Sequence, residues 1–164
     1  MKTNEVWKIT TLKIIETESH KIHKKDYTFY HIDRLKRIVE HISTNGDVCS
    51  ECAALQSDAE FLATNFVELL NSSVSQKREY EKRFDKLMLH LKKHHDIVPY
   101  NYLPAYYSFV YMIIGAAIGA LVGLVAFFSK ILVATLVGWV IGLIVGQFLG
   151  NRKELQYRVG GRII

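Results

Sequence analysis

Two short clusters of cysteine and histidine have the residue types and spacing of a metal site. The segment CSEC contains Cys49 and Cys52, and the segment HLKKHH contains His90 and His94, one helical turn apart. Thiolates and imidazoles are ligands of zinc, and two of each complete a tetrahedral site. Such a site leaves no position for water, so a structural role is expected rather than a catalytic one. The sequence therefore predicts a structural zinc site at Cys49, Cys52, His90 and His94.

Helical periodicity across residues 26–99 explains how these distant clusters could meet. Apolar residues recur there at spacings of three and four in three stretches. Asn45-Gly46 ends the first stretch, Asp47 is the expected N-cap of the second, and Pro99 ends the third. Short turns between such helices predict an antiparallel three-helix bundle in the cytosol. The seams consist of Ile32, Leu35, Val39 and Ile42, then Val48, Cys52, Leu55, Ala59, Leu62, Phe66 and Leu69, then Tyr80, Phe84, Leu87, Leu91 and His94.

An antiparallel pairing of the second and third helices places the start of one beside the end of the other. If the turn lies near Ser72-Ser73, the two thiols face the histidines at one end of the bundle. His41 and His95 also fall near this end, and either can replace one of the four predicted ligands. In the alternative interpretation, the cysteines are core residues and the histidines are a basic cluster next to the membrane.

Residues 100–150 have the pattern of a transmembrane hairpin. Residues 106–128 and 131–149 carry no charge, and each run approaches or exceeds the length of about 20 residues that spans a bilayer. The connection at Ser129-Lys130 is so short that the two helices must be antiparallel neighbours. Lysine and arginine concentrate before the first run and in the basic tail, residues 151–164. This asymmetry predicts an inner (plasma) membrane protein with both termini in the cytosol.

Seven of the ten glycines lie at every fourth position of the two apolar runs. Helices in lipid associate through close packing, which small residues allow. The two stripes either pack against each other within one hairpin, or at least one packs against a neighbouring subunit. The second arrangement predicts a homo-oligomer, with a central pore as one outcome. The stripes are Gly115, Gly119 and Gly123, then Gly138, Gly142, Gly146 and Gly150.

The remaining segments set limits on the fold and function classes. The class expected for the whole chain is all-α, and residues 1–25 form an arm that is a strand, an amphipathic helix or a loose segment.

The net charge of +5 comes from mixed charges of both signs, so no nucleic-acid partner is expected. Residues 1–30 lack the apolar core of a cleavable signal. Nucleotide-binding and hydrolase motifs are missing, so no enzyme is predicted.

These features lead to two functional hypotheses, and both include the lipid bilayer as a partner. In the first, the protein is an oligomeric pore or membrane-perturbing effector. Its layout of a cytosolic bundle and a two-helix hairpin is similar to that of small membrane effectors of bacterial defence systems. In the second, the hairpin is an anchor and the bundle is an adaptor or scaffold that recruits a cytosolic protein.

Overall fold

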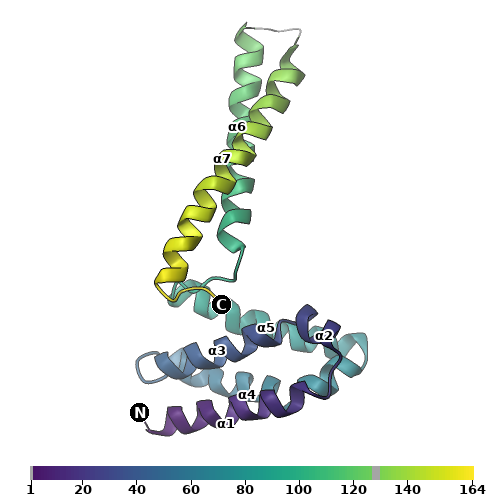
Figure 1. Ribbon diagram of the computed structural model, residues 1–164, viewed down its shortest axis with the longest axis vertical. Coiled ribbons are helices and arrows are strands. Elements are labelled where there is room, and N and C mark those ends of the chain that lie inside the picture. The colour runs from purple at the N-terminus through teal and green to yellow at the C-terminus, as the bar shows by residue number, and fades with distance from the viewer. Residues whose placement is uncertain (1, 127–129) are drawn as a thin grey trace. The chain divides into compact units, whose positions relative to one another are not determined.

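The protein is all-helical in the computed structural model, which describes residues 2–126 and 130–164 (Figure 1). It divides into two compact units: unit 1 runs to Ile97 and includes Ile164, and unit 2 comprises Val98–Ile163. The helices of unit 1 are α1 (Lys2–Ser19), α2 (Lys24–Phe29), α3 (Ile32–Asn45), α4 (Ser50–Asn71) and α5 (Val74–His94). Those of unit 2 are α6 (Tyr102–Ala126) and α7 (Ile131–Val159).

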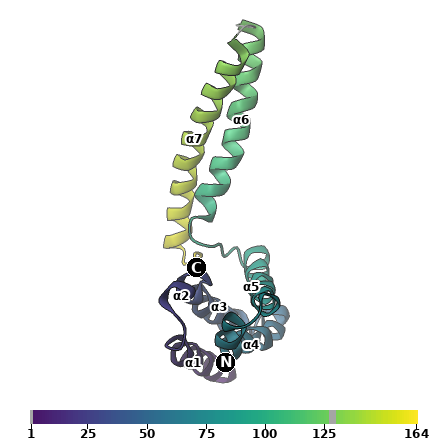
Figure 2. The same cartoon turned by 90° about the vertical axis from the view of Figure 1, so that its right-hand side faces the viewer.

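The N-terminal segment is a helix and an integral part of unit 1. Helix α1 packs against α3 and α4, and it buries Thr11 and Ile15, which lie four residues apart on one face. Of the three alternatives for residues 1–25, the structure shows a helix and not a strand (Figure 2). The predicted three-helix bundle did not include this helix. The β-branched residues of VWKITTLKII favour a strand only weakly, and tertiary packing overrides that preference.

The predicted apolar seams line the core of unit 1, with two exceptions. Val48 is 92 % exposed, and the His94 side chain is 48 % exposed. Val48 lies outside the helix because α4 begins later than predicted. Its N-cap is Cys49 rather than Asp47, and the Cys49 sulfur accepts a hydrogen bond from the Cys52 backbone N–H at 3.4 Å. Both cysteines are therefore fixed at the first turn of α4.

Polar contacts hold the antiparallel pairing of α4 and α5. The Asp58 carboxylate of α4 accepts hydrogen bonds from Arg83 at 2.8 Å and Lys86 at 2.7 Å, both on α5. A separate hydrogen bond of 3.0 Å, from the buried Tyr80 hydroxyl to the Tyr30 carbonyl oxygen, joins α5 to the segment between α2 and α3. The start of α4 therefore lies beside the end of α5, as the position of the turn predicted.

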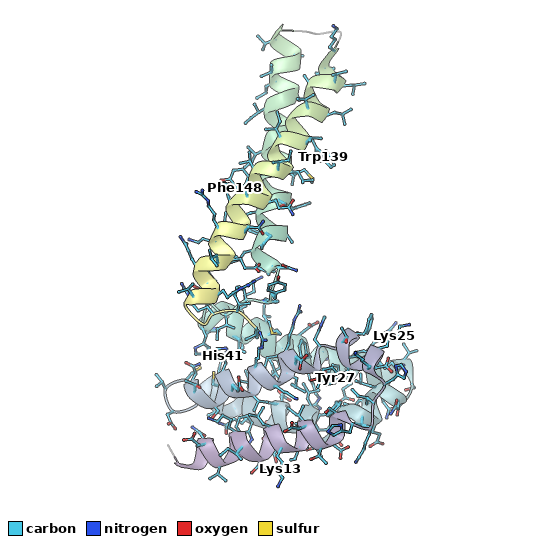
Figure 3. The ribbon with its side chains drawn as sticks, viewed as in Figure 1. Lys13, Lys25, Tyr27, His41, Trp139 and Phe148 are labelled. Carbon is cyan, nitrogen blue, oxygen red and sulfur yellow. The ribbon has the colours of Figure 1, made fainter. Side chains whose placement is uncertain are left out.

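Helices α6 and α7 of unit 2 lie side by side in both views, and both are long and apolar enough to cross a membrane (Figures 1 and 2). Only 11 % of the most apolar window in each helix is buried, whereas a core helix of a soluble protein is mostly buried. Trp139 and Phe148 are among the exposed apolar side chains of α7 (Figure 3). Phe128 and Ser129, the expected helix end and turn, lie outside the described residues.

The glycines of both stripes lie where α6 and α7 touch. A Cβ atom built on Gly115 would lie 2.2 Å from the Gly138 carbonyl oxygen, and one on Gly142 would lie 2.1 Å from the Tyr111 carbonyl oxygen. Gly119, Gly123, Gly146 and Gly150 likewise meet backbone atoms of the other helix at 2.4–2.8 Å. Both stripes are thus filled within one hairpin, and a free groove no longer supports an oligomer.

Helix α7 extends beyond the predicted end of the hairpin. It continues through Val159, so most of the basic tail is helical rather than a separate segment. Glu154 is buried there, and its carboxylate lies 3.5 Å from the Arg158 guanidinium one turn later. The Arg158 guanidinium also lies 5.1 Å from the ring centre of Tyr100, which precedes α6. The Arg158–Tyr100 contact therefore joins the end of α7 to the segment that precedes α6.

Candidate metal centre

Four side chains from the start of α4 and the end of α5 converge in unit 1. The ligand atoms of Cys49, Cys52, His90 and His95 all lie within 4.8 Å of one another. The Cys52 sulfur is 3.2 Å from Nε2 of His90 and 3.1 Å from Nε2 of His95. The Cys49 sulfur is 3.5 Å from Nε2 of His90. These four residues form a group that can hold a metal ion.

The distances fit a tetrahedral ion. Zinc bonds of about 2.3 Å to sulfur and about 2.0 Å to nitrogen give sulfur–nitrogen edges of about 3.5 Å in a regular tetrahedron. Three of the sulfur–nitrogen distances are 3.1–3.5 Å, within a few tenths of an ångström of this value, and all four donor atoms lie within 4.8 Å of one another. Two thiolates with two imidazoles favour zinc among the common divalent ions.

The structure groups His95 with the two thiols, rather than the predicted His94. Helix α5 ends at His94, and His95 leaves the helical conformation with φ −120° and ψ 3°. Asp96 then adopts a positive φ of 54°, which redirects the chain. A helix continuing to Pro99 would have turned His95 away, and this early end explains the difference. The His94 ring instead lies 3.7 Å from a Glu51 carboxylate oxygen.

His41, the other alternative considered from the sequence, lies close to the site without joining the four donors. It is half-buried on α3 (Figure 3). Burial lowers the pKa of the His41 imidazole, and the neighbouring charges, among them that of His95, contribute less. His41 is therefore a neutral neighbour of the donor group at neutral pH.

Glu51 orients His90, and sequence reasoning missed this contact. Its carboxylate oxygen lies 2.9 Å from Nδ1 of His90, on the opposite side of the ring from the thiols. The Nδ1–H then donates to Glu51, which leaves the Nε2 lone pair directed at the two sulfurs. A carboxylate behind a histidine ligand is the usual outer-shell partner in zinc sites. The only sequence signal was the position of Glu51 inside the CSEC segment.

Burial shifts the pKa values of two of the four donors, Cys52 and His95. Burial, with smaller contributions from the Cys49 thiol and the Glu51 charge, raises the pKa of the Cys52 thiol to about 12. A protonated thiol is a poor nucleophile, so Cys52 does not have the low pKa typical of reactive redox cysteines. Burial also lowers the pKa of His95, which keeps that imidazole neutral and able to bind metal.

Comparisons with known proteins do not assign this chain to a family. No family model, no curated protein and no solved structure matches the chain. The functional argument therefore depends on the donor group of unit 1 and on the apolar hairpin of unit 2.

Proposed function

We propose that this protein is a membrane-anchored zinc protein. In unit 1 the ion is held by Cys49, Cys52, His90 and His95, and it links the start of α4 to the end of α5. The observation that carries the proposal is the convergence of these four donors at edges close to those of a tetrahedron. The four donors fill the coordination shell, so the ion stabilises the bundle and performs no reaction.

The hairpin supports an anchor better than a pore. Glycines of both stripes face the other helix of the same hairpin, so neither stripe remains to line a channel or to bind a neighbouring subunit. The middle of each apolar run contains no ionisable residue, the usual mark of an ion path. The Thr135 hydroxyl donates to the Ile131 carbonyl oxygen of its own helix at 2.8 Å. These contacts favour the adaptor hypothesis, with unit 1 held at the inner membrane to recruit a cytosolic protein.

The metal proposal is tested on the full chain in detergent with cobalt as a spectroscopic substitute for zinc. One Co²⁺ per chain should bind and produce the intense sulfur-to-metal charge-transfer absorption of a thiolate site. Cys52→Ser should weaken that absorption and the affinity, whereas Ser57→Ala, on the exposed side of α4, should change neither. A wild-type chain that binds no metal, or binds without the charge-transfer band, would overturn the proposal.

The anchor is distinguished from a pore in cells. An anchor should be tolerated on overexpression and should leave the membrane potential unchanged. A pore-forming effector should depolarise the cells, and Gly142→Leu should abolish this effect, since any Cβ at that position meets the Tyr111 carbonyl oxygen at 2.1 Å. Depolarisation by the wild type that this variant removes would favour the effector hypothesis.

A further inference from the structure

A second group of metal-binding side chains shares His90 with the thiolate site. Glu51, His90 and His94 place one ligand atom each within 4.8 Å of one another. The nearest Glu51 carboxylate oxygen lies 2.9 Å from Nδ1 of His90 and 3.7 Å from Nε2 of His94. The His90 and His94 rings are stacked, with centres 5.0 Å apart, as expected one turn apart on α5. Two imidazoles and one carboxylate suit several divalent ions of the first transition row.

We propose that Glu51, His90 and His94 form an entry site, where a divalent ion binds before it reaches the thiolate site. This inference rests on the metal-binding function proposed above. Within the thiolate site Cys49 and His95 are partly exposed, but Cys52 is fully buried and His90 is only 8 % exposed, so an ion that reaches these two ligands must first pass more exposed side chains. The side chains of Glu51 and His94, by contrast, are 66 % and 48 % exposed.

A pocket of about 400 Å³ gives solvent access to the entry site. It is lined by all three donors and by the apolar side chains of Ala54, Leu55 and Leu89. The rest of the lining is Lys86 and Lys93. The Lys86 ammonium is bound to the Asp58 carboxylate at 2.7 Å, which offsets its charge against an entering cation. The pocket therefore connects Glu51 and His94 with solvent.

The shared imidazole makes the two sites successive rather than simultaneous. A neutral imidazole has one free lone pair, because its other nitrogen carries the proton. At the entry site, Nδ1 of His90 binds the ion and Nε2 is protonated. At the thiolate site, Nε2 binds the ion, and the Nδ1–H donates to Glu51. Transfer releases the two thiol protons to solvent, shifts the ring proton from Nε2 to Nδ1, and changes no oxidation state.

The entry site is tested by removing the thiols. In the full chain with Cys49→Ser and Cys52→Ser, one Co²⁺ should still bind, with weak absorption and without the sulfur charge-transfer band. Adding His94→Ala should weaken this binding by about tenfold or more, the range seen when metal-site partners are lost. Adding His20→Ala, at an exposed histidine outside both groups, is the matched control and should leave it unchanged. No cobalt binding by the double serine variant, or equal binding with and without His94, would overturn the inference.

A kinetic measurement keeps the test independent of the serine variants. With intact cysteines, His94→Ala should slow cobalt association by about tenfold or more while the final charge-transfer spectrum stays that of the wild type. The exposed position of the His94 side chain makes loss of the fold unexpected, and circular dichroism verifies this. An unchanged association rate would refute the entry site alone. A missing wild-type charge-transfer band would instead refute the zinc function.

Discussion

Removal of the metal should lower the thermal stability of unit 1 without unfolding it. In the proposed site the ion would cross-link two chain segments that are distant in sequence, since Cys52 and His95 are separated by 43 residues. The metal-free unit still has a continuous apolar core contributed by α1, α3, α4 and α5. A protein whose fold depended wholly on the ion, such as a small zinc finger, would instead unfold.

The size of this effect follows from loop closure. Treated as a cross-link that closes a loop of 43 residues, the ion removes unfolded-state entropy equal to about 4 kcal/mol at 25 °C. For a unit of about 100 residues, each kcal/mol shifts the melting temperature by about 4–8 °C. We therefore expect the melting temperature to fall by about 16–32 °C on complete removal of zinc.

The assay is thermal unfolding of the detergent-solubilised full chain, followed by circular dichroism before and after chelation. Elemental analysis verifies that the chelated sample contains no metal, and added zinc should restore the original transition. The hairpin helices contribute a constant signal if they stay folded, so near-ultraviolet bands from unit 1 provide the second observable. An identical melting temperature for verified metal-free and zinc-loaded protein would refute the reasoning.

Three further predictions test individual contacts in unit 1. Glu51→Gln should weaken zinc affinity by about 10–100-fold, because the negatively charged carboxylate no longer holds the ring of His90. Glu60→Gln, at an exposed position of the same helix, is the control and should leave zinc affinity unchanged. A competition titration measures both affinities. Tyr80→Phe should lower the free energy of unfolding by about 1 kcal/mol in a denaturant titration, through the loss of one buried hydrogen bond. Metal-free protein should lose stability as the pH falls below about 6.5, because burial lowers the pKa values of His41 and His95 in the folded state and the unfolded chain takes up protons first. Thermal melts across this pH range would contradict that reasoning if the stability stayed constant or rose.

The group of side chains that could hold a metal could be predicted to within one residue from helix periodicity. An antiparallel α4–α5 pair brings Cys49 and Cys52 to the last turn of α5, and three of the four predicted ligands belong to the group. The fourth depends on where α5 ends, and helix ends are the least certain part of a pattern. The periodic positions could not show that the chain leaves the helix at His95 and returns that ring to the thiols.

The sequence left α1 undecided between a helix, a strand and a loose segment for a different physical reason. The two buried residues of α1, Thr11 and Ile15, are β-branched, and the local sequence therefore resembles a strand. What decides the outcome is the surface left open by α3 and α4, against which α1 packs with Ile15 fully buried. That surface exists only after the other helices have assembled, so a local pattern contains no information about it.

In the hairpin, too, residue spacing predicts which face of a helix packs, but not which helix it packs against. A repeat of four predicts that the glycines of each helix share one face, and the structure places them between α6 and α7. The same repeat allows packing against a helix of the same chain or of a second copy, because close backbone packing is the same in both cases. The choice follows from the short connection, which keeps α6 and α7 within reach at no cost in association entropy. Where Gly115 and Gly138 each meet the other's carbonyl oxygen, no space remains for a third helix, so assembly of several hairpins would have to use their outer, larger apolar side chains.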